Sequence, residues 1–321
     1  MAGSRFRKAS LVVLGAVVAA LGAAAYFYQR DIQQARDRVA SGSVIAQTPC
    51  GAIEYAVAGD GEPVLVVHGA GGGFDQGLDL GNPLAARGFR VIAMSRFGYL
   101  RTPLPADATP AAQADAHACL LDALHIRRAA ILGVSAGAPS SLQFAIRYPQ
   151  RTTALVLLVP GAYRPRNAED TRAMVAPSGT KFLFDTAMRS DFLFWAAIRL
   201  ATDSMLQVLL ATDPALVASA TREEQARVAM LMEYILPVSP RRLGLLNEAR
   251  VMSTIERYAL ERITAPTLAI STQDDFYETW ETARYTATQI PRARFLGYPT
   301  GGHVLVGRQQ EVMDEIARFL K

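Results

Sequence analysis

The sequence GVSAG at residues 133–137 matches the pattern Gly-x-Ser-x-Gly, in which a tight turn between a strand and a helix carries a serine. The apolar residues 129–132 before it predict a short strand, and residues 138–147 after it predict an amphipathic helix. The flanking glycines remove Cβ atoms that would clash in such a turn. We therefore predict that Ser135 is an exposed nucleophile.

A serine hydroxyl needs a base to become a good nucleophile. His303 is the only one of the chain's four histidines that follows Ser135 in the sequence. It comes after Gly301 and Gly302, on a loop that follows the predicted strand 293–298. This placement makes His303 the candidate base.

The other three histidines have other expected places. His68 ends the apolar run 63–67, at the mouth of a predicted strand. His117 and His125 lie in the predicted helix 111–126, where we expect positions on the surface or at an edge.

A carboxylate should hold the imidazole in the correct tautomer. Residues 267–271 predict a buried strand, and Asp274 and Asp275 stand in the turn that follows it. Serine, then acid, then histidine, each after a strand, is the order found in one large class of hydrolases.

On these motifs the chain resembles the alpha/beta hydrolases, from about residue 50 to residue 321, as a member with a cap insertion. The sequence HGAGGG at residues 68–73 resembles the His-Gly loop of that family. The resemblance implies that the backbone N–H groups of Ala70 and Ala136 form the oxyanion hole, which stabilises the charge that develops on the reacting carbonyl.

The same resemblance bears on the choice between the two acids. Aligning residues 267–270 with the family's strand places Asp275 at the acid position, and Asp274 would then cap the turn. Asp274 stays open as the alternative acid.

Three departures from the family leave the subfamily and the substrate open. Residues 95–101 replace the usual Asp-x-x-Gly-x-Gly-x-Ser, Val134 stands where many members have histidine, and Ala138 stands where many have glycine. The serine nucleophile argues against the dehalogenase and epoxide hydrolase branches, which use aspartate there.

The pattern of strands and helices predicts an α/β fold, with a mostly parallel sheet covered by helices on both faces. The chain divides into a predicted anchor or signal segment, a stalk, a first hydrolase part, a helical cap and a second hydrolase part: residues 1–29, 30–43, 44–161, 162–265 and 266–321. The large apolar residues of the cap have three possible partners: the cap's own core, an apolar substrate pocket, or a nearby membrane.

The amino-terminal segment predicts a transmembrane helix. Residues 11–28 contain no charged side chain and would span about 27 Å as a helix, close to the roughly 30 Å of a bilayer's hydrocarbon core. The alternative is a signal peptide cleaved near residues 23–25. The first interpretation predicts a single-pass membrane protein with an extracytoplasmic catalytic domain, and the second predicts a secreted one.

Composition excludes other classes of function. The net charge of +4 comes from arginines interspersed with acids, which does not indicate a nucleic-acid interface. Cys50 and Cys119 could form one disulfide, and no metal-binding motif is present, so we expect neither a metal nor a cofactor.

We therefore expect a serine hydrolase that cleaves small or medium apolar carboxylic esters through Ser135, His303 and Asp275 and an acyl-enzyme. One alternative uses the same triad to hydrolyse a carbon–carbon bond in a diketone-like substrate. The other is a membrane-tethered binding module without turnover.

Overall fold

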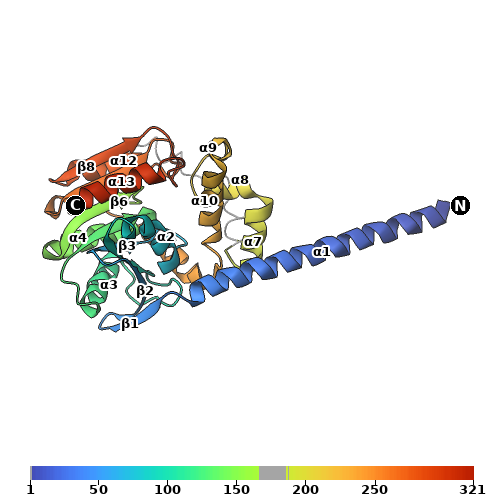
Figure 1. Cartoon of the computed structure of the whole chain (residues 1–321), viewed down its shortest axis with the longest axis horizontal. Helices are drawn as coiled ribbons and strands as arrows, with labels where there is room; N and C mark the ends of the chain where they lie inside the picture. The colour runs from blue at the N-terminus through green and yellow to red at the C-terminus, as the bar shows by residue number, and fades with distance from the viewer. Residues whose placement is uncertain (1, 166–185, 187) are drawn as a thin grey trace.

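The computed structural model describes residues 2–165, 186 and 188–321 of the chain (Figure 1). Part of the predicted cap, residues 166–185 and 187, therefore lies outside the described residues. The described chain is built around one sheet with the strand order β1-β2-β4-β3-β5-β6-β7-β8. The strands are β1 (Val44–Thr48), β2 (Gly51–Ala58), β3 (Glu62–Val67), β4 (Phe89–Met94), β5 (Ala129–Val134), β6 (Thr152–Leu158), β7 (Thr267–Thr272) and β8 (Ala293–Tyr298).

The sheet is mostly parallel, as predicted. Strands β3 to β8 all pair in parallel, whereas β1 pairs antiparallel with β2, and β2 with β4. Because the central strands are covered on both faces, their side chains are apolar at nearly every position, and Val64 to Val67 of β3 are all buried.

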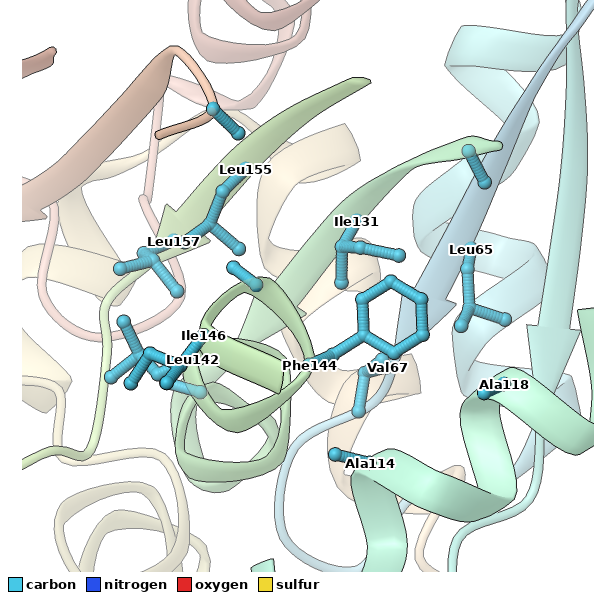
Figure 2. Close-up of a cluster of buried hydrophobic side chains, with 14 of the residues drawn as sticks. Leu65, Val67, Ala114, Ala118, Ile131, Leu142, Phe144, Ile146, Leu155 and Leu157 are labelled. Atoms are coloured by element: carbon cyan, nitrogen blue, oxygen red, sulfur yellow. The ribbon is translucent and has the colours of Figure 1, made fainter. Parts of the chain in front are cut away.

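Helices cover both faces of the sheet (Figure 1). One face packs against α3 (Pro110–Ala123), α4 (Ala138–Arg147) and α12 (Thr279–Gln289), and the other against α2 (Phe74–Ala85) and α13 (Gln309–Leu320). Figure 2 shows the first of these layers, in which Phe144 of α4 lies beside Val67 and Ile131 of the sheet. Alternate strand residues thus supply two separate cores.

A disulfide joins Cys50, in the turn between β1 and β2, to Cys119 on α3. The bridge attaches the antiparallel edge of the sheet to a helix that covers it.

Five α-helices lie in the described sequence between β6 and β7: α7 (Asp191–Leu200), α8 (Thr202–Leu209), α9 (Pro214–Ser219), α10 (Arg222–Glu233) and α11 (Arg242–Ser253). Helices α7 to α10 share an apolar cluster that is separate from the two cores of the sheet. Two residues of the amino-terminal helix, Ile32 and Ala35, belong to this cluster.

The predicted anchor and the predicted stalk are parts of one helix, α1 (Ala2–Ala40). Its amino-terminal part extends away from the rest of the protein (Figure 1). The segment Ser10–Ala40 is long and apolar enough to cross a membrane, a property that a signal sequence would share. No residue of its most apolar stretch is buried.

Candidate active site

Ser135 stands at the carboxyl end of β5, on a short 3₁₀ turn that leads into α4. Its φ of 48° lies in the left-handed region, which is uncommon for a residue with a side chain. The neighbouring glycines are required by crowding: a Cβ at Gly133 would collide with Ser141, and one at Gly137 would collide with the carbonyl of Val67. The turn therefore presents the serine side chain beyond the end of the strand.

Three predicted site residues meet at this edge of the sheet. His303 Nε2 lies 2.9 Å from Ser135 Oγ, and His303 Nδ1 lies 2.8 Å from Asp275 Oδ2. Because a carboxylate can only accept, Nδ1 carries the proton, and Nε2 is left free to accept the serine hydroxyl proton. The three side chains form a continuous hydrogen-bonded chain from acid to hydroxyl.

The Asp275 carboxylate is buried and fully engaged. Its Oδ1 accepts a hydrogen bond of 2.8 Å from the N–H of Tyr277, and its Oδ2 accepts one from the hydroxyl of Thr279 as well as from His303. These donors fix the direction in which the carboxylate points.

Asp274 has a different task from Asp275. Its two oxygens accept hydrogen bonds from the N–H groups of Gly302 and Gly301, at 2.8 and 3.1 Å. Asp274 therefore fixes the loop that carries His303 and does not contact the imidazole.

The loop with Ala70 runs beside the nucleophile. A Cβ added at the preceding residue, Gly69, would lie 3.2 Å from the Cβ of Ser135. Ala136 follows Ser135 directly in the 3₁₀ turn. The structure thus brings the two predicted oxyanion residues to the same end of the sheet as Ser135.

The carbonyl of Gly69 is held from behind by two side chains. It accepts hydrogen bonds from Nδ1 of His68, at 2.7 Å, and from Nη2 of Arg96, at 3.1 Å. The tautomer of His68 is fixed because its Nε2 accepts from the backbone N–H of Arg96, at 3.0 Å. Burial, and then the charge of Arg96, hold the pKa of His68 well below its usual value, so the ring stays neutral.

Arg96 is a buried cation that links the site to helix α11. Its guanidinium forms an ion pair with Glu248 and donates to the carbonyl of Ala136 at 3.2 Å. Tyr99 also donates to Glu248, and its hydroxyl accepts from the N–H of Gly71 at 3.4 Å. Burial raises the pKa of Tyr99 to about 12, so this phenol keeps its proton.

Arg96, Tyr99 and Glu248 lie around the site although they were not predicted there. In the sequence, residues 95–101 stand out only as a departure from a family motif. An arginine directly after the apolar strand β4 was the available signal, but its partner Glu248 is 152 positions away in the chain.

The prediction for His117 was wrong. His117 is fully buried between α3 and α4, where its Nε2 lies 3.1 Å from Ser140 Oγ. Burial lowers the pKa of His117 to about 3, so the ring is neutral, and its contact with Ser140 joins the two helices.

His125 follows the end of α3 and has no part in the site.

A cavity opens at Ser135. Gly69, Ala70, Ser135 and His303 line one end of it. The rest of the wall is mostly apolar and includes Leu80, Leu158, Leu209, Leu210, Leu231 and Met313.

Two charged side chains reach this wall, and both have partners. Arg227 donates to both carboxylate oxygens of Glu224, at 2.7 and 2.9 Å, and to the carbonyl of Val304. Asp79 accepts from the hydroxyl of Tyr234 at 3.3 Å, and burial raises its pKa. Within the described ranges, no group of three or more His, Cys, Asp or Glu side chains is placed to hold a metal ion.

Comparison with known proteins gives a family match over most of the chain. The model of the alpha/beta hydrolase fold family matches residues 62–307. A solved alpha/beta hydrolase fold protein from Nakamurella multipartita is similar, with a TM-score of 0.65 and 29% identity over 87% of this chain and 98% of that one. An enol-lactonase from Burkholderia xenovorans shares the fold, with a TM-score of 0.65 over 86% of this chain and 99% of its own, at 18% identity.

Similarity to curated proteins covers shorter segments. An uncharacterised hydrolase of Bacillus subtilis is 36% identical over 33% of this chain and 37% of its own length. The 2-hydroxy-6-oxononadienedioate/2-hydroxy-6-oxononatrienedioate hydrolase of Paraburkholderia xenovorans is 31% identical over 48% of this chain and 60% of its own. The 2-hydroxy-6-oxo-6-phenylhexa-2,4-dienoate hydrolase of Comamonas testosteroni is 35% identical over 34% and 40%. The chain therefore matches less than two thirds of the length of these relatives.

Proposed function

Because the chain belongs to the alpha/beta hydrolase fold family, we propose that it is a serine hydrolase that cleaves carboxylic esters with Ser135, His303 and Asp275. The observation that carries this proposal is the chain of hydrogen bonds from Asp275 through His303 to Ser135, with both distances below 3 Å. A serine with a base in contact, and a base oriented by a carboxylate, is the arrangement that nucleophilic catalysis requires.

The reaction follows from the proton positions in this chain. Ser135 Oγ attacks the ester carbonyl carbon while His303 Nε2 takes the hydroxyl proton. The imidazolium then gives this proton to the leaving alcohol, and an acyl-Ser135 ester remains. A water molecule, deprotonated by His303, attacks the acyl carbon and releases the acid, and the proton returns to Ser135.

The oxyanion that forms in each half of the reaction needs two donors. We assign them to the N–H groups of Ala70 and Ala136. In a trans peptide the C=O and the N–H point in opposite directions. His68 and Arg96 hold the carbonyl of Gly69, so the N–H of Ala70, which belongs to the same peptide unit, is directed away from them. Ala70 thus depends for its orientation on two buried side chains behind the loop.

The pocket favours an uncharged substrate with an apolar acyl group. Its described wall is mainly aliphatic, and the arginine in it, Arg227, is already neutralised by Glu224. The helices α7 to α11 would act as the cap that supplies part of this wall, through Leu209 and Leu210 of the α8 end and Leu231 of α10.

Carbon–carbon bond hydrolysis is the second candidate, and the names of the curated relatives favour it. Those names describe dienoates, which are carboxylates. A buried carboxylate substrate needs a cation as partner, whereas the charged groups that line this pocket within the described residues are Arg227, already paired with Glu224, and the acid Asp79. This difference supports the ester over the dienoate.

For the amino terminus we propose that α1 is retained as a single-pass anchor and that the catalytic part lies on the extracytoplasmic side. The length and exposure of its apolar part support a membrane span. The alternative is a cleaved signal sequence and a secreted enzyme.

The test is covalent labelling combined with turnover. The full chain in detergent is treated with a fluorophosphonate probe and assayed on p-nitrophenyl esters of several chain lengths and on a 2-hydroxy-6-oxo dienoate. Ser135→Ala should abolish labelling and lower kcat by about 10⁴-fold or more, because the members of a triad act as a unit. Ser219→Ala, an exposed serine on α9, is the matched control and should retain both.

The outcomes separate the three candidates. Labelling with ester turnover supports the proposal. Labelling with turnover of the dienoate alone would assign the carbon–carbon hydrolase. A folded protein that neither labels nor turns over any substrate would be the inactive binding module.

A further inference from the structure

Helix α1 is fixed to the rest of the protein by side-chain contacts and is not a flexible tether. Asp31 accepts hydrogen bonds from Nε1 of Trp195 and Nη2 of Arg199 on α7, at 2.9 and 2.8 Å. About two helical turns further on, Arg38 pairs with Asp75 of α2 at 3.1 Å. The orientation of α1 therefore sets the orientation of the rest of the protein.

Apolar packing supports the same joint. Ile32 and Ala35 are 1% and 2% exposed, and both belong to the apolar cluster of α7 to α10. Charged contacts and apolar burial together make α1 and α7 a single rigid unit.

An aromatic cluster marks the level at which the exposed apolar part of α1 ends. Tyr28, the last residue of that part, packs edge-on against Phe192 and Trp195 of α7, with ring centroids 5.1 and 5.6 Å apart. Tyrosine and tryptophan are enriched where a transmembrane helix leaves the hydrocarbon core. If residues 11–28 cross a bilayer, α7 lies at its surface.

Helix α7 exposes apolar side chains next to this cluster. Phe192, Leu193 and Leu200 are 45%, 40% and 87% exposed. Leu193 and Leu200 are seven residues apart and so lie on one face of the helix. Among the described residues nothing covers this apolar face, and leaving apolar surface in contact with water is unfavourable.

We propose that this face of α7, formed by Phe192, Leu193 and Leu200, rests on the lipid bilayer that α1 crosses. The occupant is the apolar edge of the bilayer, because the rigid joint brings the face to the membrane surface without any further partner. The inference rests on the proposed retention of α1 as an anchor and does not depend on the triad.

The proposed membrane contact is connected to the wall of the pocket beside Ser135. Helix α7 leads within two residues into α8, and Leu209 and Leu210 at the end of α8 line the pocket beside Ser135. The wall of the pocket is thus continuous with the element that lies on lipid.

Spin labels on the full chain in phosphatidylcholine nanodiscs test this arrangement. Single cysteines are introduced as Leu193→Cys and Leu200→Cys, while Cys50 and Cys119 stay protected in their disulfide. Val57→Cys is the matched control, because Val57 is 41% exposed on β2, away from the protruding end of α1 (Figure 1). Leu14→Cys reports on α1 itself. Each nitroxide is measured for relaxation by oxygen, which partitions into lipid, and by a water-soluble nickel chelate.

We expect the oxygen effect to dominate at positions 14, 193 and 200 and the nickel effect to dominate at position 57. Nickel dominance at 193 and 200 with oxygen dominance at 14 would overturn the membrane contact and leave the anchor standing. Nickel dominance at 14 would overturn both. Immobile labels at 193 and 200 that neither reagent reaches would instead place a second protein copy on the face.

Discussion

At the scale of single residues, two adjacent carboxylates hold His303 in position through different contacts. Asp275 bonds to the His303 imidazole, and Asp274 bonds to the backbone amides of Gly301 and Gly302, just before His303. Asp275 acts on the side chain of His303, whereas Asp274 acts on its loop. Replacing each with asparagine should therefore affect turnover differently.

Asp275→Asn should lower kcat by about 10⁴-fold with little change in KM, because an amide in this position favours the wrong imidazole tautomer. Asp274→Asn should keep most of the activity, since an amide oxygen can still accept from one glycine N–H. Steady-state kinetics on a p-nitrophenyl ester would check both. A larger loss in Asp274→Asn than in Asp275→Asn would reverse the assignment.

Arg96 should affect the rate although it touches no substrate. Losing one oxyanion donor costs about 10²–10³-fold in kcat, and Arg96→Gln removes only one of the two side chains that orient the Gly69–Ala70 peptide. We therefore expect a loss of about tenfold to a hundredfold in kcat, with KM nearly unchanged.

Stability must be separated from positioning in that experiment. Removing one partner of a buried ion pair costs about 3–5 kcal/mol of folding free energy, so Arg96→Gln is compared with Arg96→Gln/Glu248→Gln, which removes both charges. If the double variant melts near the parent and turns over at the parental rate, Arg96 has a structural role only.

Patterns local in the sequence make Ser135 and His303 candidates, and contacts distant in the sequence explain what was missed. Gly133 and Gly137 flank Ser135, Gly301 and Gly302 precede His303, and each candidate follows an apolar strand. The choice of Asp275 relied on family register, since both acids stand in the same turn. Glu248 could not be found, because nothing near residue 248 indicates that its helix packs on Arg96.

At the scale of elements, a buried histidine between two helices makes the stability of the fold depend on pH. His117 of α3 bonds to Ser140 of α4, and burial gives it a pKa of about 3. An unfolded histidine titrates near 6.5. Below pH 6.5, His117 therefore binds a proton in the unfolded chain but not in the folded chain, and the free energy of unfolding falls as the pH decreases.

Between pH 7 and pH 5 this residue should cost the protein about 2 kcal/mol of unfolding free energy. His117→Gln removes this titration. The unfolding free energy of the variant should therefore fall by about 2 kcal/mol less than that of the parent between pH 7 and pH 5. Denaturant unfolding of both chains at the two pH values measures the difference. Equal losses in parent and variant would contradict the assignment.

The central strands were predicted closely, whereas α2 was mostly missed. Residues 267–271 were expected as a strand, and β7 is Thr267–Thr272. Helix α2 has no clear signal in the sequence, because Gly77, Gly81 and Pro83 disfavour helix locally. The structure shows why they are there: a Cβ at Gly81 would lie 2.5 Å from Val91, so small residues let α2 pack closely on β4. Tertiary packing overrides propensity at this helix.

At the scale of the whole molecule, the fate of α1 decides how the enzyme is held in the cell. If the helix is an anchor, the mature protein should keep its amino-terminal residues and stay in the membrane fraction after an alkaline wash. Mass spectrometry of that fraction would detect peptides from residues 11–30. A mature chain that starts just after residue 25 and is soluble would establish the signal peptide instead.

The bridge between Cys50 and Cys119 has a consequence for where the chain can mature. Disulfides persist in oxidising compartments and are rare where glutathione keeps thiols reduced. The two cysteines are 69 positions apart, and closing a loop of that size in the unfolded chain is worth about 4 kcal/mol in the chain-entropy model. We therefore expect a copy made in a reducing cytosol to be the less stable form, and the chain to reach its full stability only after translocation.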